Sequence, residues 1–486
     1  MRLSELLREV EFEGSIKNDF DIKFVTDDSR LVRPGALFVC IRHRSFDGHT
    51  AAAEALASGA AAVVTQERLG LENELNVADS RAAYARLCAA LCGHPERKLR
   101  MIGVTGTNGK TTVTTLIRNI LSDSGIKTLL TGTVCNRLGE ESLPSGLTTP
   151  KPPELYSLLS RAVLSGCEAC VAEASSQALA QGRLEGIAFD AAVFTNITRD
   201  HLDYHGTFEN YLAAKKKLFE HSDVSAVNLD DPRADEIIAA SSGKPVTFST
   251  VLDCADYTAK NISLLPEGVS FELVSKGRIE HINFASPGLF SVSNAMAAAV
   301  CAINLGVDPR SAAQSLARSK GVCGRLERVE CGTPYSVIID YAHTPDGLEQ
   351  VLRALRPSCR GKLIVLFGCG GDRDKTKRPL MGAAACKYAD TVIVTSDNPR
   401  SEEPMKIIGD ILKGTDKKRQ GLFIEEDRRR ATALALSLAK PGDTVLLAGK
   451  GHEKYQLICG EKLPLDERET VREILGLPHD TGRKKP

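Results

Sequence analysis

The sequence lacks an excess of charge of either sign. Its 62 lysine and arginine residues balance 62 aspartate and glutamate residues, so the formal net charge at pH 7 is zero. Proteins that bind nucleic acid usually carry a surplus of positive charge, so we expect no nucleic-acid partner. Tryptophan is absent and aromatic residues make up 5%, but the apolar share (42%) and the charged share (26%) are those of a globular protein. This composition excludes a disordered or fibrous chain, and 486 residues accommodate about three domains.

The sequence also lacks the marks of a secreted or membrane protein. Residues 1–10 contain no apolar secretion segment, and the 14 cysteines are scattered, so we expect a cytoplasmic protein with reduced thiols. The one Cys-x-x-Cys, Cys167 to Cys170, lies in an apolar run and indicates buried thiols rather than a metal or redox site. The uncharged stretch 283–307 contains Pro287 and Gly288 and therefore predicts a buried helix, not a membrane span.

Short apolar runs alternate with helical stretches along the whole chain, which is the pattern of an α/β protein. Repeats of fixed period and low-complexity linkers are absent from the sequence. We predict a small N-terminal α/β domain at 1–98, a central P-loop mononucleotide-binding α/β domain at 99–328 and a C-terminal Rossmann-like α/β domain at 329–486. The basic tail from 479 to 486 is expected to fray.

Polar clusters directly follow the apolar, strand-like runs. In the central region, the runs 101–104, 170–172 and 191–197 precede the clusters 106–112, 173–176 and 198–201. In the third region, the runs 337–339, 363–367, 391–394 and 444–447 precede the clusters 340–346, 368–374, 397–400 and 449–453. Ligands of open parallel sheets bind at the carboxyl ends of the strands. We therefore predict two crevices, one in each large domain, that face each other.

The cluster 106–112 has the composition of a phosphate-binding loop. Small residues let backbone amides close around phosphate oxygens, Lys110 can neutralise the β- and γ-phosphates, and the Thr111 hydroxyl can ligate Mg²⁺. The spacing departs from the usual P-loop, because Val104 stands where the first glycine would be, and the loop alone could be a turn that binds no nucleotide. The predicted nucleotide contacts in this loop are Gly106, Thr107, Asn108, Gly109, Lys110, Thr111 and Thr112.

This shortened loop and several later segments resemble the Mur ligase family, which adds amino acids to cytoplasmic peptidoglycan precursors. The similar segments span nearly the whole chain and are 195–196, 201–206, 228–231, 324–327, 340–346 and 397–400. The resemblance implies an ATP-dependent amide ligase that works with Mg²⁺ through an acyl phosphate. It further implies the form that joins meso-2,6-diaminopimelate to the D-Glu γ-carboxylate of UDP-MurNAc-L-Ala-D-Glu, and we expect a monomer.

Crowding a carboxylate against a phosphoryl group requires positive charge, which two metal ions can supply. The resemblance implies that Glu173 and Thr111 hold one Mg²⁺, that His201 holds the other, and that Lys215 is carbamylated and thereby an anionic ligand. Judged from the residues alone, His201 could be a surface histidine and Lys215 part of a solvated helix face. With Lys110, the resemblance makes Glu173, His201 and Lys215 the candidate catalytic residues.

The resemblance also assigns residues to the adenosine half of ATP. It implies that Asn294 contacts adenine, and that Arg325, Asp340 and His343 reach the ribose or the phosphates when the domains close. Ser291 stands where the family usually has a further asparagine, and Asn294 alone could be a buried helix cap.

The resemblance places the uridine nucleotide in the N-terminal domain and the muramoyl dipeptide against the central domain. His43 replaces a customary glycine there, and Gln177 stands where many relatives have histidine. Each of these polar residues taken singly could serve a turn or a cap. The implied contacts are Ser29, Thr148, Thr149, Ser175, Gln181 and Arg183.

The third domain is predicted to bind the amino acid. Arg373 and Arg400 can each pair with a carboxylate and Glu453 can accept an ammonium, which suits the zwitterionic end of meso-diaminopimelate but not lysine. The segment 397–400 alone could be a β-turn. The implied set is Arg373, Asp397, Asn398, Pro399, Arg400, Gly449 and Glu453. The alternatives are a lysine-adding Mur ligase, a folylpolyglutamate synthase, or a nucleotide-binding protein without catalysis.

Overall fold

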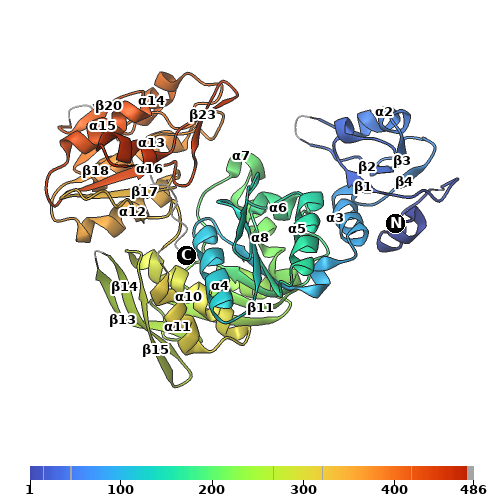
Figure 1. Ribbon diagram of the computed structural model, residues 1–486, viewed down its shortest axis with the longest axis horizontal. Coiled ribbons are helices and arrows are strands. Elements are labelled where there is room, and N and C mark those ends of the chain that lie inside the picture. The colour runs from blue at the N-terminus through green and yellow to red at the C-terminus, as the bar shows by residue number, and fades with distance from the viewer. Residues whose placement is uncertain (15, 44–45, 266, 320, 417–418, 479–486) are drawn as a thin grey trace.

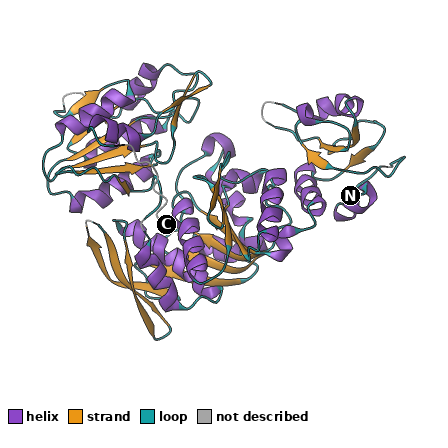
Figure 2. Cartoon of the chain, viewed as in Figure 1, coloured by secondary structure: helices purple, strands orange, loops and turns teal. Residues whose placement is uncertain are grey.

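The computed structural model describes residues 1–14, 16–43, 46–265, 267–319, 321–416 and 419–478. The tail that we expected to fray lies outside the described residues. Figure 1 shows three bodies: the N-terminal one in blue, the C-terminal one in orange to red, and the central one between and below them. Each consists of a sheet with helices packed against it (Figure 2).

The N-terminal domain is a parallel sheet of strand order β1-β2-β3-β4. Residues of β2 and β3 are buried on both faces, because α2 covers one face while α1 and α3 cover the other. The strands are β1 (Phe24–Thr26), β2 (Ala36–Val39), β3 (Ala60–Thr65) and β4 (Glu74–Asn76), and the helices are α1 (Leu3–Leu6), α2 (Ala52–Ala57) and α3 (Ser80–Leu91).

The central domain has the sheet order β15-β14-β13-β12-β11-β10-β5-β9-β6-β7-β8, parallel from β13 to β6 and antiparallel at both edges. Its strands are β5 (Arg100–Thr105), β6 (Thr128–Thr131), β7 (Asn136–Leu138), β8 (Glu141–Leu143), β9 (Ala169–Glu173), β10 (Phe189–Phe194), β11 (Ser222–Asn228), β12 (Lys244–Ser249), β13 (Tyr257–Leu265), β14 (Gly268–Ser275) and β15 (Arg278–Phe284). Its helices are α4 (Lys110–Asp123), α5 (Pro152–Leu164), α6 (Ser176–Ala180), α7 (Leu202–His205), α8 (Phe208–Lys216), α9 (Ala234–Ala240), α10 (Leu289–Asn304) and α11 (Pro309–Arg318).

The uncharged stretch forms the buried helix that the sequence predicts. Helix α10 begins after Gly288, whose φ of 92° favours glycine, and packs against the sheet and α4. Within the described part of the chain, no helix is long and apolar enough to cross a membrane.

The C-terminal domain has the sheet order β16-β17-β21-β18-β19-β20, in which only β16 among the described strands runs antiparallel to its neighbour. Alternate residues of the central strands face α12 to α14 on one side and α15 and α16 on the other. The strands are β16 (Glu327–Arg328), β17 (Ser336–Asp340), β18 (Leu363–Phe367), β19 (Thr391–Val394), β20 (Leu422–Ile424) and β21 (Thr444–Ala448), with a hairpin of β22 (Tyr455–Ile458) and β23 (Glu461–Pro464). The helices are α12 (Pro345–Leu355), α13 (Lys377–Tyr388), α14 (Pro404–Leu412), α15 (Arg428–Leu438) and α16 (Glu467–Ile474).

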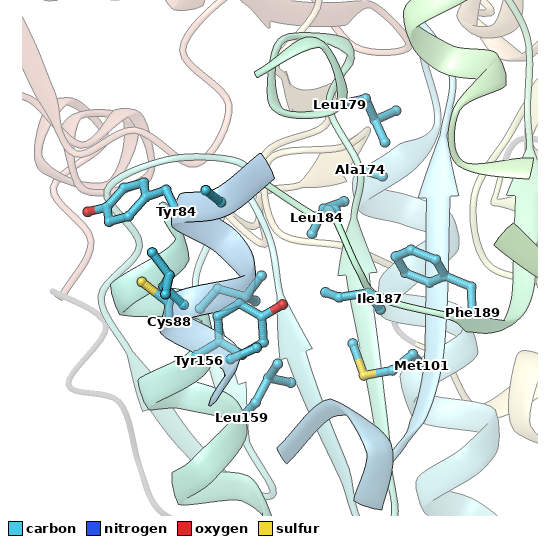
Figure 3. Close-up of a cluster of buried hydrophobic side chains, with 14 of the residues drawn as sticks. Tyr84, Cys88, Met101, Tyr156, Leu159, Ala174, Leu179, Leu184, Ile187 and Phe189 are labelled. Carbon is cyan, nitrogen blue, oxygen red and sulfur yellow. The ribbon is translucent and has the colours of Figure 1, made fainter. Parts of the chain in front are cut away.

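A hydrophobic cluster joins the N-terminal domain to the central one. Figure 3 shows Tyr84 and Cys88 of α3 beside Tyr156 and Leu159 of α5, with Met101 of β5 across the cluster from them, next to Ile187. These side chains are almost completely buried. The two domains therefore share a continuous apolar core at this junction.

The strand-like runs of the sequence are strands of the structure, with one change at β10. This strand ends at Phe194, before the predicted end at 197, because the Asn196 carbonyl accepts a hydrogen bond from the Thr107 amide at 2.8 Å. The chain after β10 thus supports the phosphate loop instead of continuing the sheet. The division at 98 and 328 remains our proposal for the domain boundaries.

Candidate active site

The two predicted crevices open into a common cavity of about 370 Å³ between the central and C-terminal domains. Its walls are the carboxyl ends of parallel strands in both sheets, as the sequence pattern predicts. The predicted residues that line it are Gly106, Thr107, Asn108, Gly109, Lys110, Thr111, Thr148, Thr149, Glu173, Ser175, Arg183, His201, Lys215, Arg325, His343, Arg373, Asp397, Asn398, Arg400, Gly449 and Glu453.

A smaller cavity of about 90 Å³ adjoins the phosphate loop. Thr112, Asn294 and Asp340 line it, together with parts of the phosphate loop and with Val322, Arg325 and Leu326. These last three belong to the segment that follows α11, which we call the hinge. Among the described residues, the predicted Ser29, Gln181 and Pro399 line neither cavity. The small cavity has the location that the adenosine assignment requires, beside the phosphate loop and between the two domains.

The phosphate loop is held in shape by the chain that follows β10. The Thr195 hydroxyl donates to the Asn108 carbonyl at 2.6 Å, and the Asn196 side chain accepts from the Asn108 amide at 3.0 Å. Gly109 has a φ of 86°, and a Cβ there would lie 2.5 Å from Asn294 Oδ1, so only glycine fits.

The Lys110 ammonium lies over its own loop. Its Nζ donates to the carbonyls of Gly106 at 2.7 Å and Thr107 at 2.9 Å, and burial lowers its pKa. A phosphate in the loop would be a stronger acceptor than these neutral carbonyls. The position suits a cation that transfers its hydrogen bonds to phosphate oxygens.

Glu173 ends β9 with its carboxylate at the cavity wall and is only 1% exposed. Its Oε2 accepts from the hydroxyls of Thr111 at 3.1 Å and Thr133 at 2.9 Å, and its Oε1 accepts from the Thr133 amide at 2.8 Å. Thr133 was not predicted, although it follows the end of β6, where the strand-end pattern places site residues. Glu173 and Thr111 form a pair of hard oxygen donors.

The donors Glu173 and Thr111 are too few for a site built entirely of protein ligands, but they suit Mg²⁺. Within the described ranges, no group of three or more histidine, cysteine, aspartate or glutamate residues could hold a metal ion. Mg²⁺ is usually bound through one or two carboxylates, with water and substrate phosphates completing its shell. Glu173 beside Thr111 and the phosphate loop is such a partial site.

Lys215 faces the cavity from the last turn of α8 and is 1% exposed. Its Nζ lies 3.5 Å from Thr105 Oγ1 and 4.6 Å from the centre of the Tyr211 ring. Burial, with Lys110 nearby, lowers its pKa well below the ordinary value of 10.5. The solvated-face interpretation is therefore wrong for Lys215, whereas the neighbouring Lys217 is exposed.

His201 precedes α7 in the left-handed conformation, with a φ of 52°. Its Nε2 lies 3.4 Å from Asp200 Oδ2, and burial lowers its pKa. A neutral imidazole is the form that ligates metals, so the environment suits the predicted role.

The segment between the two large domains brings Arg325 to Thr111 at the start of α4. Arg325 Nη2 donates to Thr111 Oγ1 at 3.2 Å, and its guanidinium lies 4.8 Å from the centre of the Tyr341 ring. Asp340 accepts from the amides of Leu326 and Ala342, both at 2.7 Å, and so fixes the hinge. These contacts give Asp340 a structural role in addition to its place beside the small cavity.

Two further residues of the C-terminal domain lie at this junction; His343 lines both cavities, and Asp346 contacts the phosphate loop without lining either. His343 Nδ1 lies 2.8 Å from the Tyr341 carbonyl oxygen, and burial lowers the pKa of His343 to about 4. Asp346, at the start of α12, accepts from Asn108 Nδ2 at 3.0 Å. The phosphate loop therefore contacts the C-terminal domain directly.

Ser291 does not reproduce the asparagine of the family pattern. Its hydroxyl donates to the Pro287 carbonyl at 2.8 Å and pairs with the Ser286 hydroxyl at 2.9 Å. Ser291 is buried in the first turn of α10, and both of these hydrogen bonds are made inside the protein. Asn294 and Ser291 both line the small cavity, but the hydroxyl of Ser291 is already bonded within the start of α10.

The predicted dipeptide residues form a wall next to Glu173. Arg183 donates to the Thr149 carbonyl at 2.7 Å and, through Nε at 2.9 Å and Nη2, to Gln181 Oε1. The Thr149 hydroxyl pairs with Ser175 Oγ at 3.1 Å, and Ser175 caps α6 through the Ala178 amide. Gln181 lies behind Arg183 and orients its guanidinium.

In the N-terminal domain, Asp27 gathers the polar side chains near Ser29. His43 Nε2 lies 3.5 Å and Lys151 Nζ 3.0 Å from Asp27 Oδ2. Lys151 belongs to the central domain, so this carboxylate also links the two domains.

The part of the cavity that contains the predicted amino-acid residues is formed by loops after β18, β19 and β21. Arg373 is exposed and forms no ion pair with any described residue. Arg400, with a φ of 53°, donates through Nη1 to the Gly371 carbonyl at 2.6 Å, and its backbone bridges to the hairpin strand β22. Glu453 Oε2 accepts from Asn398 Nδ2 at 2.9 Å. The three predicted charged groups thus lie around one opening.

Comparisons with known proteins cover most of the chain. Family models described as "Mur ligase family, catalytic domain", "Mur ligase middle domain" and "Mur ligase, glutamate ligase domain" match residues 21–89, 104–302 and 324–451. UDP-N-acetylmuramoyl-L-alanyl-D-glutamate--2,6-diaminopimelate ligases of Syntrophomonas wolfei and Clostridium tetani are 43% and 41% identical, each over 98% of this chain and 99% of theirs.

Solved structures give the same pattern. A UDP-N-acetylmuramoyl-L-alanyl-D-glutamate--2,6-diaminopimelate ligase is 34% identical with a TM-score of 0.71, over 98% of this chain and 99% of that one. The MurF ligase of Thermotoga maritima in complex with ADP has a TM-score of 0.61 at 20% identity, over 94% of this chain and 97% of that one. A folylpolyglutamate synthase of Mycobacterium tuberculosis complexed with ADP also has a TM-score of 0.61, at 19% identity, over 76% of this chain and 91% of that one. The last two likenesses concern the fold alone.

Proposed function

The chain belongs to the Mur ligase family, and we propose that this ligase uses ATP to join meso-2,6-diaminopimelate to the D-Glu γ-carboxylate of UDP-MurNAc-L-Ala-D-Glu. The observation that carries the proposal is the common cavity. It places the phosphate loop and Glu173 opposite Arg400 and Glu453, so a phosphoryl group and an amino acid can meet there.

The proposed reaction has two steps. An oxygen of the substrate carboxylate attacks the γ-phosphorus of ATP, which forms an acyl phosphate and releases ADP. The amine of the amino acid then attacks the acyl carbon, the bond to the phosphate oxygen breaks, and inorganic phosphate leaves as the amine loses its proton. Both steps require reacting groups held close together in a site that excludes water.

The chain's own residues supply charge and orientation for the first step. Lys110 neutralises phosphate oxygens, and Arg325, in the segment that leads into the C-terminal domain, brings a second cation to Thr111. We assign one Mg²⁺ to Glu173 and Thr111 and a second to His201. When bound, these ions would neutralise the phosphates further. Thr133 orients Glu173 by holding both carboxylate oxygens.

Lys215 is assigned as a carbamate. Its neutral amine would attack carbon dioxide, form an N–C bond and release a proton, which leaves a carboxylate on nitrogen. Burial favours the neutral amine, and Lys110 nearby favours the resulting anion. The product is an anionic group placed where the resemblance puts a metal ligand.

The amino-acid assignment depends on the cationic groups of the C-terminal domain. Arg373 and the remaining donors of Arg400 are available for a carboxylate, and Glu453 Oε1 for an ammonium. A lysine side chain would leave the half-buried guanidinium of Arg400 unmatched, which costs binding energy.

The test is phosphate release with ATP, Mg²⁺ and UDP-MurNAc-L-Ala-D-Glu, with mass spectrometry of the product. We expect turnover with meso-diaminopimelate and none with L-lysine. Turnover with lysine alone would reject the amino-acid assignment but keep the ligase. Turnover only with a folate and glutamate would reject the peptidoglycan assignment altogether.

A further inference from the structure

We propose that Lys450 is a positioning residue for the amino-acid substrate, because its buried ammonium holds Asn398 and Glu453 in the orientation in which they bind the distal end of that substrate. This inference rests on the proposed function. The sequence placed Lys450 in a strand-end cluster but gave it no role.

Lys450 follows β21 and is completely buried, with an exposed fraction of 0%. Its Nζ donates to Asn398 Oδ1 at 2.9 Å and to Glu453 Oε2 at 2.5 Å. Asp397 Oδ1 lies 3.9 Å from the same nitrogen. One ammonium therefore contacts the side chains of two different strand-end loops, after β19 and after β21.

These contacts fix which atoms remain for a ligand. Asn398 Oδ1 accepts from Lys450 and from the Leu457 amide at 2.9 Å, while its Nδ2 donates to Glu453 Oε2 at 2.9 Å. The side-chain amide of Asn398 therefore cannot flip, exchanging its oxygen and nitrogen, without losing all three bonds. On Glu453, Oε2 is occupied, and among the described residues Oε1 accepts only from the Tyr341 hydroxyl, at 3.5 Å. Lys450 thereby presents Oε1 to the cavity.

The charge of Lys450 also matters to selectivity. Asp397 and Glu453 are two carboxylates in one largely buried place, and Lys450 is within 4 Å of both. With this cation present, the acidic charge is partly compensated before a substrate arrives. Without it, the pocket would be more negative by one unit, which disfavours a substrate carboxylate and favours a side chain that carries only an ammonium.

Arg428 offers a matched control beneath the same loops. It is also buried, and it donates to the carbonyls of Ala448 at 2.7 Å and Ser396 at 3.1 Å and to Glu467 Oε1 at 2.8 Å. It therefore supports the ends of β19 and β21 through the main chain and does not line the cavity. Loss of Arg428 tests the effect of removing a buried cation without removing the side-chain orientation.

The experiment compares the steady-state kinetics of the full-length wild type, Lys450→Met, Glu453→Gln, the double variant and Arg428→Met. For Lys450→Met we expect the KM for meso-diaminopimelate to rise about tenfold or more, with a smaller change in kcat and unchanged KM for ATP and for the nucleotide substrate. The preference for meso-diaminopimelate over L-lysine should fall. The double variant should be less impaired than the product of the two single effects, because part of the effect of Lys450 is transmitted through Glu453.

Three results would overturn the inference in an active wild type: an unchanged KM for meso-diaminopimelate in Lys450→Met, multiplicative effects in the double variant, or the same selective rise in Arg428→Met. If Lys450→Met does not fold, as judged by thermal unfolding, Lys450→Gln replaces it. Gln retains an uncharged NH₂ donor group, so the KM of this variant should lie between wild type and Glu453→Gln, and a wild-type value would reject the role. A wild type that is silent with meso-diaminopimelate would instead reject the proposed function.

Discussion

Three consecutive lysines on α8 have different environments. Lys215 is buried against Tyr211, Lys216 pairs with Glu236 at 2.9 Å, and Lys217 is exposed. The geometry of α8 therefore directs Lys215, but not Lys217, into the cavity, although the two are only two residues apart in one basic run. The low pKa of Lys215 follows from that placement rather than from its neighbours in the sequence.

The Lys215→Arg variant tests the carbamate. An arginine keeps the positive charge but cannot capture carbon dioxide, so we expect kcat to fall by at least about a hundredfold, as on removal of a preorganised charge from a transition state. Lys217→Arg is the control and should keep wild-type turnover. Phosphate release in buffers depleted of carbon dioxide, then supplied with bicarbonate, should show recovery for the wild type only. Full activity of Lys215→Arg would eliminate the carbamate.

Arg400→Ala tests the choice of amino acid. The variant removes a guanidinium whose free donors face the cavity, so the KM for meso-diaminopimelate should rise by about tenfold to a hundredfold, the cost of one charge-assisted hydrogen-bond pair. The exposed Arg430 on α15 provides the control, Arg430→Ala. Competition between meso-diaminopimelate and L-lysine, read by mass spectrometry, measures the preference. An unaltered preference in Arg400→Ala would show that another group selects the substrate.

His343 makes the stability depend on pH. Burial lowers its pKa from 6.5 to about 4 in the folded protein, so the unfolded chain binds this proton first as the pH falls. Stability should therefore decrease from about pH 6.5 to about pH 4 and be unaffected by this group at higher pH. His201 and His452, whose pKa values burial also lowers, add to the same slope. Urea unfolding at several pH values in this range measures how the free energy of unfolding changes with pH. This dependence should be shallower for His343→Gln and unchanged for the exposed His281→Gln; equal slopes for the two variants would contradict the assignment.

At the scale of elements, the ends of parallel strands carry most of the site. The sequence pattern located the phosphate loop, Glu173 and the loop of Asp397 because each directly follows a continuous apolar run. The same rule applies to Thr133 after β6, but a single threonine carries no charge that would mark it. Chemistry that resides in charged or glycine-rich strand ends is therefore predictable from sequence.

Other parts of the site depend on packing that a sequence does not display. Tyr211 lies four residues before Lys215, a spacing that puts both on one face of α8 and could have signalled their contact. The bonds of Lys450 join two loops some fifty residues apart in sequence, and nothing local indicates them. The occupied hydroxyl of Ser291 likewise became visible only with the turn that precedes α10.

Arg428 connects two strand ends, and its loss should affect stability first. Its removal deprives Glu467, itself fully buried, of its ion-pair partner and takes a donor from each of two carbonyls. We expect Arg428→Met to lower the free energy of unfolding by about 3–5 kcal/mol. The exposed Arg429→Met on the same helix is the control, although it forms a surface pair with Glu473 worth at most about 1 kcal/mol. Urea denaturation compares the two, and equal losses would contradict a special role for the buried pair.

At the scale of the whole molecule, the two domain junctions differ in chemistry. The N-terminal domain is joined to the central domain through the apolar cluster of α3 and α5 (Figure 3). The C-terminal domain meets the phosphate loop through a polar contact from Asn108 to Asp346, and Arg325, in the segment just before the proposed boundary, contacts Thr111. Polar junctions of this kind separate more readily than apolar ones, so the C-terminal domain is the one whose position should respond to nucleotide.

Asp346 tests that response. Its Oδ2 accepts from Asn108 Nδ2 at 3.0 Å and from Thr198 Oγ1 at 3.3 Å, so it links α12 to two loops of the central domain. Asp346→Ala should raise the KM for ATP by about tenfold, since each hydrogen bond to a charged group contributes about 1.5–3 kcal/mol when the domains meet. Thr344 still caps α12 in the variant, so thermal stability should change little.

Arg353→Ala, exposed on the same helix, is the matched control for Asp346→Ala and should keep the wild-type KM for ATP. Calorimetric titration with ADP separates binding from turnover: a weaker ADP affinity in Asp346→Ala means that the contact stabilises the closed, nucleotide-bound arrangement. An unchanged affinity together with a lower kcat would assign the contact to the chemical steps instead. Unchanged values for both would mean that the Asn108–Asp346 contact takes no part in closure, and that Arg325 alone couples the hinge to the nucleotide.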